Sequence, residues 1–168
     1  MNKLELAFKA FDDYNKKDPT IFEWEDVKHP QEYFFALALH NWILRLNPAA
    51  NEVLLLASRC QHIGRWERLR SNYPEGREGY LTWRRELGIY HAEIAGKILQ
   101  EIGYNDFEIE SVKRILLKKK IKVDADVQTM ENALCLVFLE LQYEEFLLKH
   151  SPEKVINILK KLIIWPFS

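Results

Sequence analysis

The sequence predicts an all-α protein, and three observations support that fold class. Apolar residues recur at three- and four-residue spacings through nearly the whole chain, which is the pattern of amphipathic helices. No segment shows sustained alternation of apolar and polar residues, which is the pattern of half-buried strands. Helix-breaking prolines lie between the periodic segments, at Pro19, Pro48 and Pro152. We therefore expect a single compact domain of about six to seven helices over residues 1–168.

Each expected helix begins or ends at residues typical of that position. Pro30 suits the first turn of the second helix. The third helix is apolar on almost every side, so we expect it at the centre of the fold. Gly88 lies inside the fourth helix, which we expect to be irregular there. A short connector with Phe22 and Trp24 precedes the second helix. In chain order, the expected helices cover residues up to about 17, 30–46, 50–63, 79–102, 107–118, 126–148 and 152–164.

The bulk composition excludes several classes of protein. A net charge of −1 gives no general attraction for nucleic acid or a membrane surface. The chain does not begin with an apolar secretion signal, and no apolar run approaches the ~20 residues of a membrane-spanning helix. Cys60 and Cys135 both lie in apolar runs, as reduced cysteines do. We expect a cytoplasmic protein without nucleic-acid or membrane partners, whose oligomeric state the sequence does not determine.

Three histidines and one carboxylate lie where the chain is otherwise most apolar. His40, His62 and His91 lie within or next to apolar segments, and Glu131 directly precedes another. Burying such groups is unfavourable unless they are hydrogen-bonded or bind a cation. Because imidazole and carboxylate commonly bind iron, manganese and zinc, we expect these four residues to hold one divalent transition metal. For any single histidine, the alternative is a hydrogen bond to a backbone carbonyl.

The order of these residues resembles the HD phosphohydrolase superfamily. The run from Ala57 to Gly64 is similar to that superfamily's apolar helix ending in His-Asp-Ile-Gly. His91-Ala92-Glu93 is similar to a later segment that begins His-x-Glu, and the residues around Asn132 are similar to its closing Ala-Asp-Ala-Leu. The resemblance implies an HD-like helical core over about residues 30–149, followed by the C-terminal helix.

Three substitutions within these motifs change what the resemblance implies. Gln61 stands where the superfamily has the first histidine of its His-Asp pair, and Asn132 stands where it has its last aspartate. His62 occupies the position of the paired aspartate. The resemblance therefore implies a mononuclear metal centre, with Gln61 and Asn132 supporting the ligands.

A closer resemblance covers most of the chain. Residues 57–66, 73–84 and 136–140 are similar to segments of domain-of-unknown-function family 4202. These motifs are specific, so the chain is identified as a member of that family. The resemblance implies no particular activity, substrate or cofactor.

An arginine-rich connection follows the helix that carries His62. Seven of the nine arginines lie between residues 59 and 85, within a stretch that is also rich in glycine. We expect Arg65, Arg77 and Arg84 to hold an anion, because guanidinium groups pair with phosphate and carboxylate through two parallel hydrogen bonds. Their alternative is ion pairing with neighbouring glutamates on a solvated surface. The lysine-rich run 118–122 is interpreted as the flank of a helix C-terminus.

Together these residues predict a metal-dependent hydrolase of a small phosphorylated or otherwise anionic substrate. The metal would activate a water molecule, and Glu131 or Glu93 would transfer its proton. Tyr80 and Trp83 are placed to bind the substrate by stacking on a planar group. The alternative function is a non-catalytic helical binding module in which the metal site is structural or vestigial.

Overall fold

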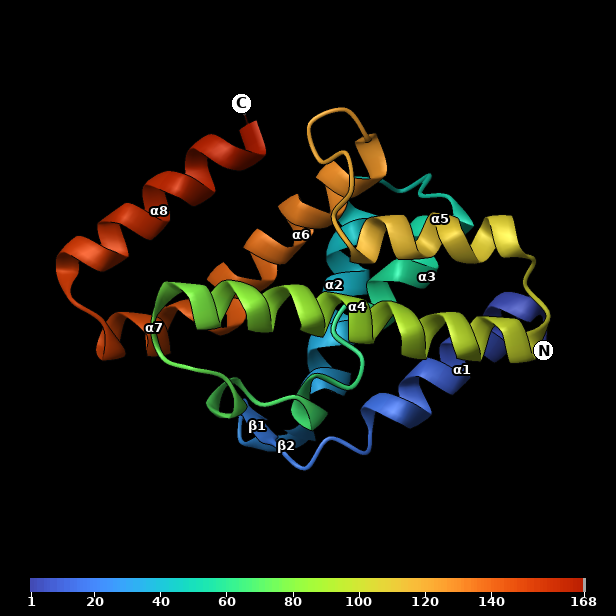
Figure 1. The fold of residues 1–168 in the computed structure, drawn as a ribbon, viewed down its shortest axis with the longest axis horizontal. Coiled ribbons are helices and arrows are strands. Elements are labelled where there is room, and N and C mark those ends of the chain that lie inside the picture. The colour runs from blue at the N-terminus through green and yellow to red at the C-terminus, as the bar shows by residue number, and fades with distance from the viewer. Residues whose placement is uncertain (168) are drawn as a thin grey trace.

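Helices account for most of the backbone that the computed structural model describes, which is residues 1–167, with side chains described for residues 1–161 (Figure 1). The prediction of an all-α fold is confirmed. The described elements are α1 (Lys3–Asn15), β1 (Ile21–Trp24), β2 (Val27–Pro30), α2 (Gln31–Leu46), α3 (Glu52–Cys60), the short 3-10 helices η1 (Arg65–Glu67) and η2 (Arg70–Asn72), α4 (Gly76–Ile102), α5 (Asp106–Leu116), α6 (Ala125–Leu141), α7 (Tyr143–Lys149) and α8 (Pro152–Phe167).

Helix α3 lies at the centre of the fold, as its sequence predicts. It packs against α1, α2, α5 and α6, and Leu54, Ala57 and Cys60 are completely buried. Asn51 begins the helix by accepting a hydrogen bond from the backbone N–H of Leu54 at 2.9 Å. Because other helices surround α3 on several sides, the residues that directly follow α3 lie in the interior of the molecule.

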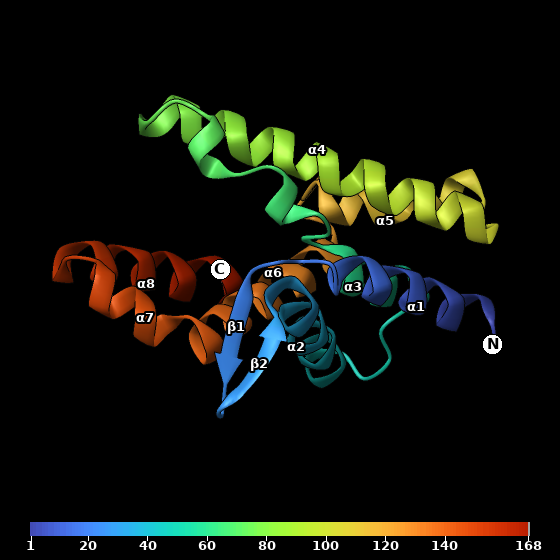
Figure 2. The same ribbon diagram turned by 90° about the horizontal axis from the view of Figure 1, so that it is seen from below.

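The helices form two layers, and α3 lies in the same layer as α1, α2 and α6 (Figure 2). Helices α4 and α5 pack together in one layer, and α1, α2 and α6 lie on the other side, while α7 and α8 extend away from the centre. The predicted irregularity at Gly88 is wrong, because α4 is continuous from Gly76 to Ile102. None of the helices in the described part of the chain has the length and apolar character needed to cross a bilayer.

The connector before α2 is a β-hairpin, which the sequence analysis missed. Strands β1 and β2 pair antiparallel with Trp24 opposite Val27. Glu25 and Asp26 form the turn with φ values of 50° and 63°, the left-handed geometry that joins tight hairpins. Four-residue strands are too short to show alternation, and Glu-Asp is not the usual turn dipeptide. The hairpin stays in place because Phe22 packs against Phe35 of α2.

The predicted helix over residues 126–148 is divided at Gln142. Helix α6 ends at Leu141, α7 starts at Tyr143, and Gln142 between them leaves the helical conformation with φ −125° and ψ −11°. Apolar periodicity continues on both sides of the break, so the sequence pattern predicts one helix. The break matters for the site, because the Gln142 side chain lines the cavity described next.

Candidate functional site

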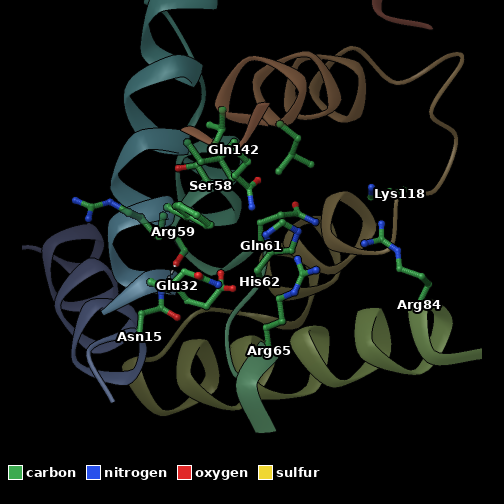
Figure 3. A pocket seen from close by; sticks show the side chains of 16 residues that line it. Asn15, Glu32, Ser58, Arg59, Gln61, His62, Arg65, Arg84, Lys118 and Gln142 are labelled. Atoms are coloured by element: carbon green, nitrogen blue, oxygen red, sulfur yellow. Dashed lines mark hydrogen bonds between the residues drawn. The ribbon is translucent and has the colours of Figure 1, made fainter. Parts of the chain in front are cut away.

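A polar cavity of about 260 Å³ lies beside α3 (Figure 3). Side chains from α1, α2, α3, α4 and α6 line it, together with residues that follow α3 and α5. Figure 3 shows Asn15 and Glu32 at one end and Arg84 and Lys118 at the other, with Gln61, His62 and Arg65 between them. The cavity therefore joins residues that lie as far apart in the sequence as α1 and α6.

A tight turn after α3 places His62 and Arg65 in this cavity. Gly64 adopts φ 72° and ends the turn, and the N–H of Arg65 donates to the carbonyl of His62 at 3.1 Å. A Cβ atom on Gly64 would lie 2.5 Å from the Ile94 side chain of α4. Glycine is therefore required here both for the left-handed backbone and for the close approach of α4.

Four cationic side chains line the cavity, and two of them have no carboxylate partner among the described residues. Neither Arg65 nor Arg84 forms an ion pair with a carboxylate of residues 1–161. Lys118 pairs with Glu131 at 3.1 Å. By contrast, Arg59, whose side chain also lines the cavity, is held by Asp12 at 2.9 Å. Arg65 and Arg84, two of the three arginines expected to hold an anion, line the same cavity as His62.

Lys118 reaches the cavity through an unusual backbone conformation. It follows the end of α5 with φ 56°, in the left-handed region that residues other than glycine rarely adopt. The N–H of Lys119 donates to the carbonyl of Arg114 at 3.0 Å, which closes the helix end. The interpretation of this lysine as part of a helix flank is therefore incomplete, because its side chain also lines the cavity.

His62 and His91 lie side by side as neutral imidazoles. Their ring centres are 5.7 Å apart. The Nδ1 atom of His91 lies 2.6 Å from the carbonyl oxygen of Ile63, which only accepts, so Nδ1 carries the hydrogen. Burial lowers the pKa of His91 to about 4. Burial also lowers the pKa of His62 far below its usual value, and the positive charge of Arg65 adds to that shift.

Glu32 is a buried carboxyl group in the cavity that the sequence analysis missed. Burial raises its pKa to about 7, although Arg65 acts in the opposite direction. Asp18 fixes its backbone by accepting the N–H of Glu32 at 2.9 Å. A signal was present in the sequence, because Glu32 lies three and seven residues before the buried Phe35 and Leu39 and so shares their helical face.

Two buried amides in the cavity have oxygen atoms without a hydrogen-bond donor among the described residues. Asn15 donates its Nδ2 to the carbonyl of Arg59 at 3.0 Å, and Gln61 donates its Nε2 to the carbonyl of Leu116 at 3.5 Å. With each amide nitrogen assigned to a carbonyl partner, the oxygen of each amide faces the other way. Oδ1 of Asn15 and Oε1 of Gln61 are then left unpaired. Gln61 was predicted to support a metal ligand, and Asn15 was not predicted at all.

The other predicted metal ligands and their supporting residue do not line the cavity, and each has a hydrogen-bond or ion-pair partner of its own. His40 bonds to Ser58 at 2.8 Å through Nδ1, and Ser58 donates to the carbonyl of Leu55 at 2.6 Å. The partner of His40 is thus a side-chain hydroxyl, whereas His91 forms the bond to a backbone carbonyl that was the alternative to metal binding. Burial lowers the pKa of His40 to about 4. Glu131 pairs with Lys118, as described above. Asn132 accepts a hydrogen bond from Gln128 at 3.0 Å.

The described residues offer no ligand set for a metal ion. Among them, no group of three or more histidine, cysteine, aspartate or glutamate side chains is arranged to hold one. The charged groups that act on His62 are Arg65, Arg84 and Lys118, which would repel a second cation. These surroundings fit an anion and do not fit a metal ion. A transition metal bound by His40, His62, His91 and Glu131 stays a prediction, and no step below depends on it.

The remaining predicted residues do not line the cavity. Arg77 is exposed in the first turn of α4, and Glu93 lines a separate surface hollow with Lys97. Trp83 is buried and donates its Nε1 to the carbonyl of Arg68 at 2.9 Å. Tyr80 is largely exposed, with its ring 5.9 Å from that of Trp83. Trp83 therefore holds the arginine-rich connection onto α4, and both aromatic rings lie outside the cavity.

Comparison with known proteins identifies the family but no activity. A family model described as "Domain of unknown function (DUF4202)" matches residues 5–164, so the chain belongs to that family. No curated protein and no solved structure matches the chain. The resemblance to the HD superfamily consequently stays a prediction.

Proposed function

We propose that this member of the DUF4202 family binds a small phosphate-bearing molecule in the cavity beside α3, which is called the anion cavity below. One observation carries the proposal. Arg65, Arg84 and Lys118 line a single cavity, and the two guanidinium groups have no carboxylate partner among residues 1–161. Partial burial strengthens the attraction between these charges and an anion relative to an exposed surface, because fewer water molecules screen it.

The chemistry of the wall favours phosphate over a weaker anion. Arginine presents parallel N–H groups that match two oxygens of one phosphate, and the adjacent Lys118 adds a point charge. His62 is neutral, so its ring adds a hydrogen-bonding group without a charge of its own. The volume of about 260 Å³ is below the roughly 300–1,000 Å³ of pockets for drug-sized ligands, which favours a small molecule.

A catalytic role is the second candidate, and Glu32 favours it. A carboxyl group with a pKa of about 7 exchanges protons near neutral pH, as a general acid or base must. Glu32 lies in the same cavity as Arg65, so it would act near the bound anion. The reaction class expected from this pairing is hydrolysis of a phosphate ester, which agrees with the activity predicted from the sequence. Release of inorganic phosphate from a panel of phosphate monoesters, lost in Glu32→Gln, separates a hydrolase from a binding module.

Isothermal titration with inorganic phosphate and pyrophosphate tests the proposal. We expect Arg65→Met and Arg84→Met each to weaken binding about tenfold to a hundredfold, because a hydrogen bond to a charged group contributes about 1.5–3 kcal/mol. Arg77→Met is the matched control, since that arginine is exposed on α4 and lies outside the cavity. Unchanged binding in both cavity variants would contradict the proposal. Loss of binding after treatment with a chelator would instead support the metal centre.

A further inference from the structure

The geometry points to a hydroxyl-bearing phosphate monoester, such as a sugar phosphate or polyol phosphate, as the ligand of the anion cavity. This inference rests on the proposed function for the phosphate end of the molecule. Its new content concerns the remainder of the ligand, which would donate hydrogen bonds to a second set of side chains. That set consists of Asn15, Glu32 and Gln61, called the acceptor group below. Arg65, Arg84 and Lys118 are called the cation group.

The acceptor group consists of buried side chains, and two of its members have an oxygen atom without a donor among the described residues. Asn15, Glu32 and Gln61 are 2%, 4% and 3% exposed, so bulk water does not reach them freely. Oδ1 of Asn15 and Oε1 of Gln61 have no donor, and their amide nitrogens are committed to the carbonyls of Arg59 and Leu116. Buried polar atoms are nearly always paired in folded proteins, so these oxygens indicate a bound partner with donors.

Hydroxyl groups fit these acceptors better than an ammonium group does. An ammonium group would enter a cavity that already holds the cation group, and like charges there repel one another. Two of the three acceptors are neutral amides, which bind a neutral donor without needing a charge on it. A hydroxyl also accepts a hydrogen bond in return, so the same group can bind Arg65 or Gln142 on its other side.

The apolar part of the wall favours a compact carbon skeleton over a nucleobase. Phe35 is the one phenyl, phenol or indole ring among the described residues that line the cavity. Trp83 and Tyr80, which were expected to stack a planar group, lie outside it. Leu39, Leu134 and Val137 provide aliphatic contacts suited to the carbon atoms of a sugar or polyol. A sugar-sized body also agrees with a cavity of about 260 Å³.

Titration with matched pairs of phosphate esters tests the inference. Glycerol 3-phosphate and n-propyl phosphate have the same chain length and differ in two hydroxyl groups. We expect glycerol 3-phosphate to bind at least about tenfold more tightly, the gain expected from a donor that pairs buried acceptors. Equal binding of the two esters overturns the inference and leaves the proposed function standing. Failure of both esters and of inorganic phosphate to bind would overturn the proposed function as well.

A third ester and two variants locate the effect. Tighter binding of O-phosphoethanolamine than of glycerol 3-phosphate would overturn the assignment of hydroxyl donors. In Gln61→Met, we expect the affinity ratio of glycerol 3-phosphate to n-propyl phosphate to fall to about one or a few fold. Gln100→Met is the control, because Gln100 is exposed on α4 and far from the cavity lining. Asn15→Leu repeats the test from α1, and an unchanged ratio in both cavity variants overturns the inference.

Discussion

The cation group and the acceptor group of the anion cavity differ in how the fold holds them. Asn15, Glu32 and Gln61 are buried and backed by bonds to neighbouring elements. The three cationic side chains are only partly buried and come from η1, from α4 and from the segment after α5. A partly exposed cation is stable without a ligand, because water solvates it. A buried acceptor is not solvated by bulk water, so leaving it unpaired is unfavourable.

This difference assigns separate roles to the two groups. The cation group supplies attraction for phosphate, which any small phosphorylated molecule satisfies. The acceptor group supplies selectivity, because a ligand that lacks donors leaves buried oxygens unpaired. Each prediction below changes one group and measures whether the other is affected, beginning with the largest expected effect.

Glu32→Gln should change the dependence of stability on pH. Burial raises the pKa of this carboxyl group from 4.5 to about 7, so the folded state binds more protons than the unfolded chain between these values. The wild-type protein therefore loses stability as pH rises through that window. Glutamine does not titrate, so the variant should gain about 3 kcal/mol relative to wild type between pH 4.5 and pH 8. Urea unfolding at the two pH values measures this difference.

A constant difference between the two proteins at both pH values would show that Glu32 does not have a raised pKa. Glu23→Gln is the control, because that residue is exposed in β1. Its stability difference from wild type should not show the same dependence on pH.

Sulfate binding should weaken above neutral pH. Sulfate keeps a charge of about −2 throughout the range, so a change in its affinity reports on the protein. An ionised Glu32 repels the anion and competes for Arg65, whereas a protonated one does not. Affinity should be nearly constant below pH 7 and should fall by up to about tenfold per pH unit above it. His62 and His91 stay neutral over this range, because the pKa of each is lowered.

The same titration in Glu32→Gln should show affinity that is nearly independent of pH. If the variant retains the decrease above pH 7, another group near the cation group causes it. Ionisation of Glu32 in the acceptor group would then have no effect on anion binding at the cation group.

Lys118→Gly and Lys120→Gly form a matched pair for the smallest effect. Both lysines have left-handed backbones, with φ 56° and 57°, so glycine relieves the same local strain at either position. Only Lys118 lines the anion cavity, and Lys120 is exposed. We expect phosphate affinity to fall about fivefold to tenfold in Lys118→Gly and to be unchanged in Lys120→Gly, because only one variant removes a cation from the cavity. Equal losses in the two variants, measured by titration, would remove Lys118 from the cation group.

The fold could be predicted largely from the sequence because its signals are local. Apolar periodicity reports which face of a helix is buried, and this was sufficient to predict α3 as the central helix. The same signal is weak where elements are short or where a break leaves the pattern unchanged. The hairpin at Ile21–Pro30 and the division at Gln142 were missed for these reasons.

Part of the candidate site could also be predicted from the sequence. His62, Arg65 and Arg84 follow or face the most apolar helix, and the structure places all three at one cavity. The metal ligand set was inferred from the expected burial and the side-chain chemistry of its members, and neither identifies which residues are neighbours. His40 is half-buried beside Ser58 of α3 and Phe8 of α1 and does not line the cavity, although its helical position resembles that of a ligand.

The sequence by itself determined the helices, the central position of α3 and the gathering of cationic residues after it. Only the tertiary structure decided which polar groups share a space. Asn15 and Glu32 meet Arg65 because α1 and α2 pack around α3, and Lys118 joins them through its left-handed backbone. A helical pattern specifies which direction a side chain faces relative to its own axis. Its partners are set by the packing of other helices, and this is a property of the whole chain.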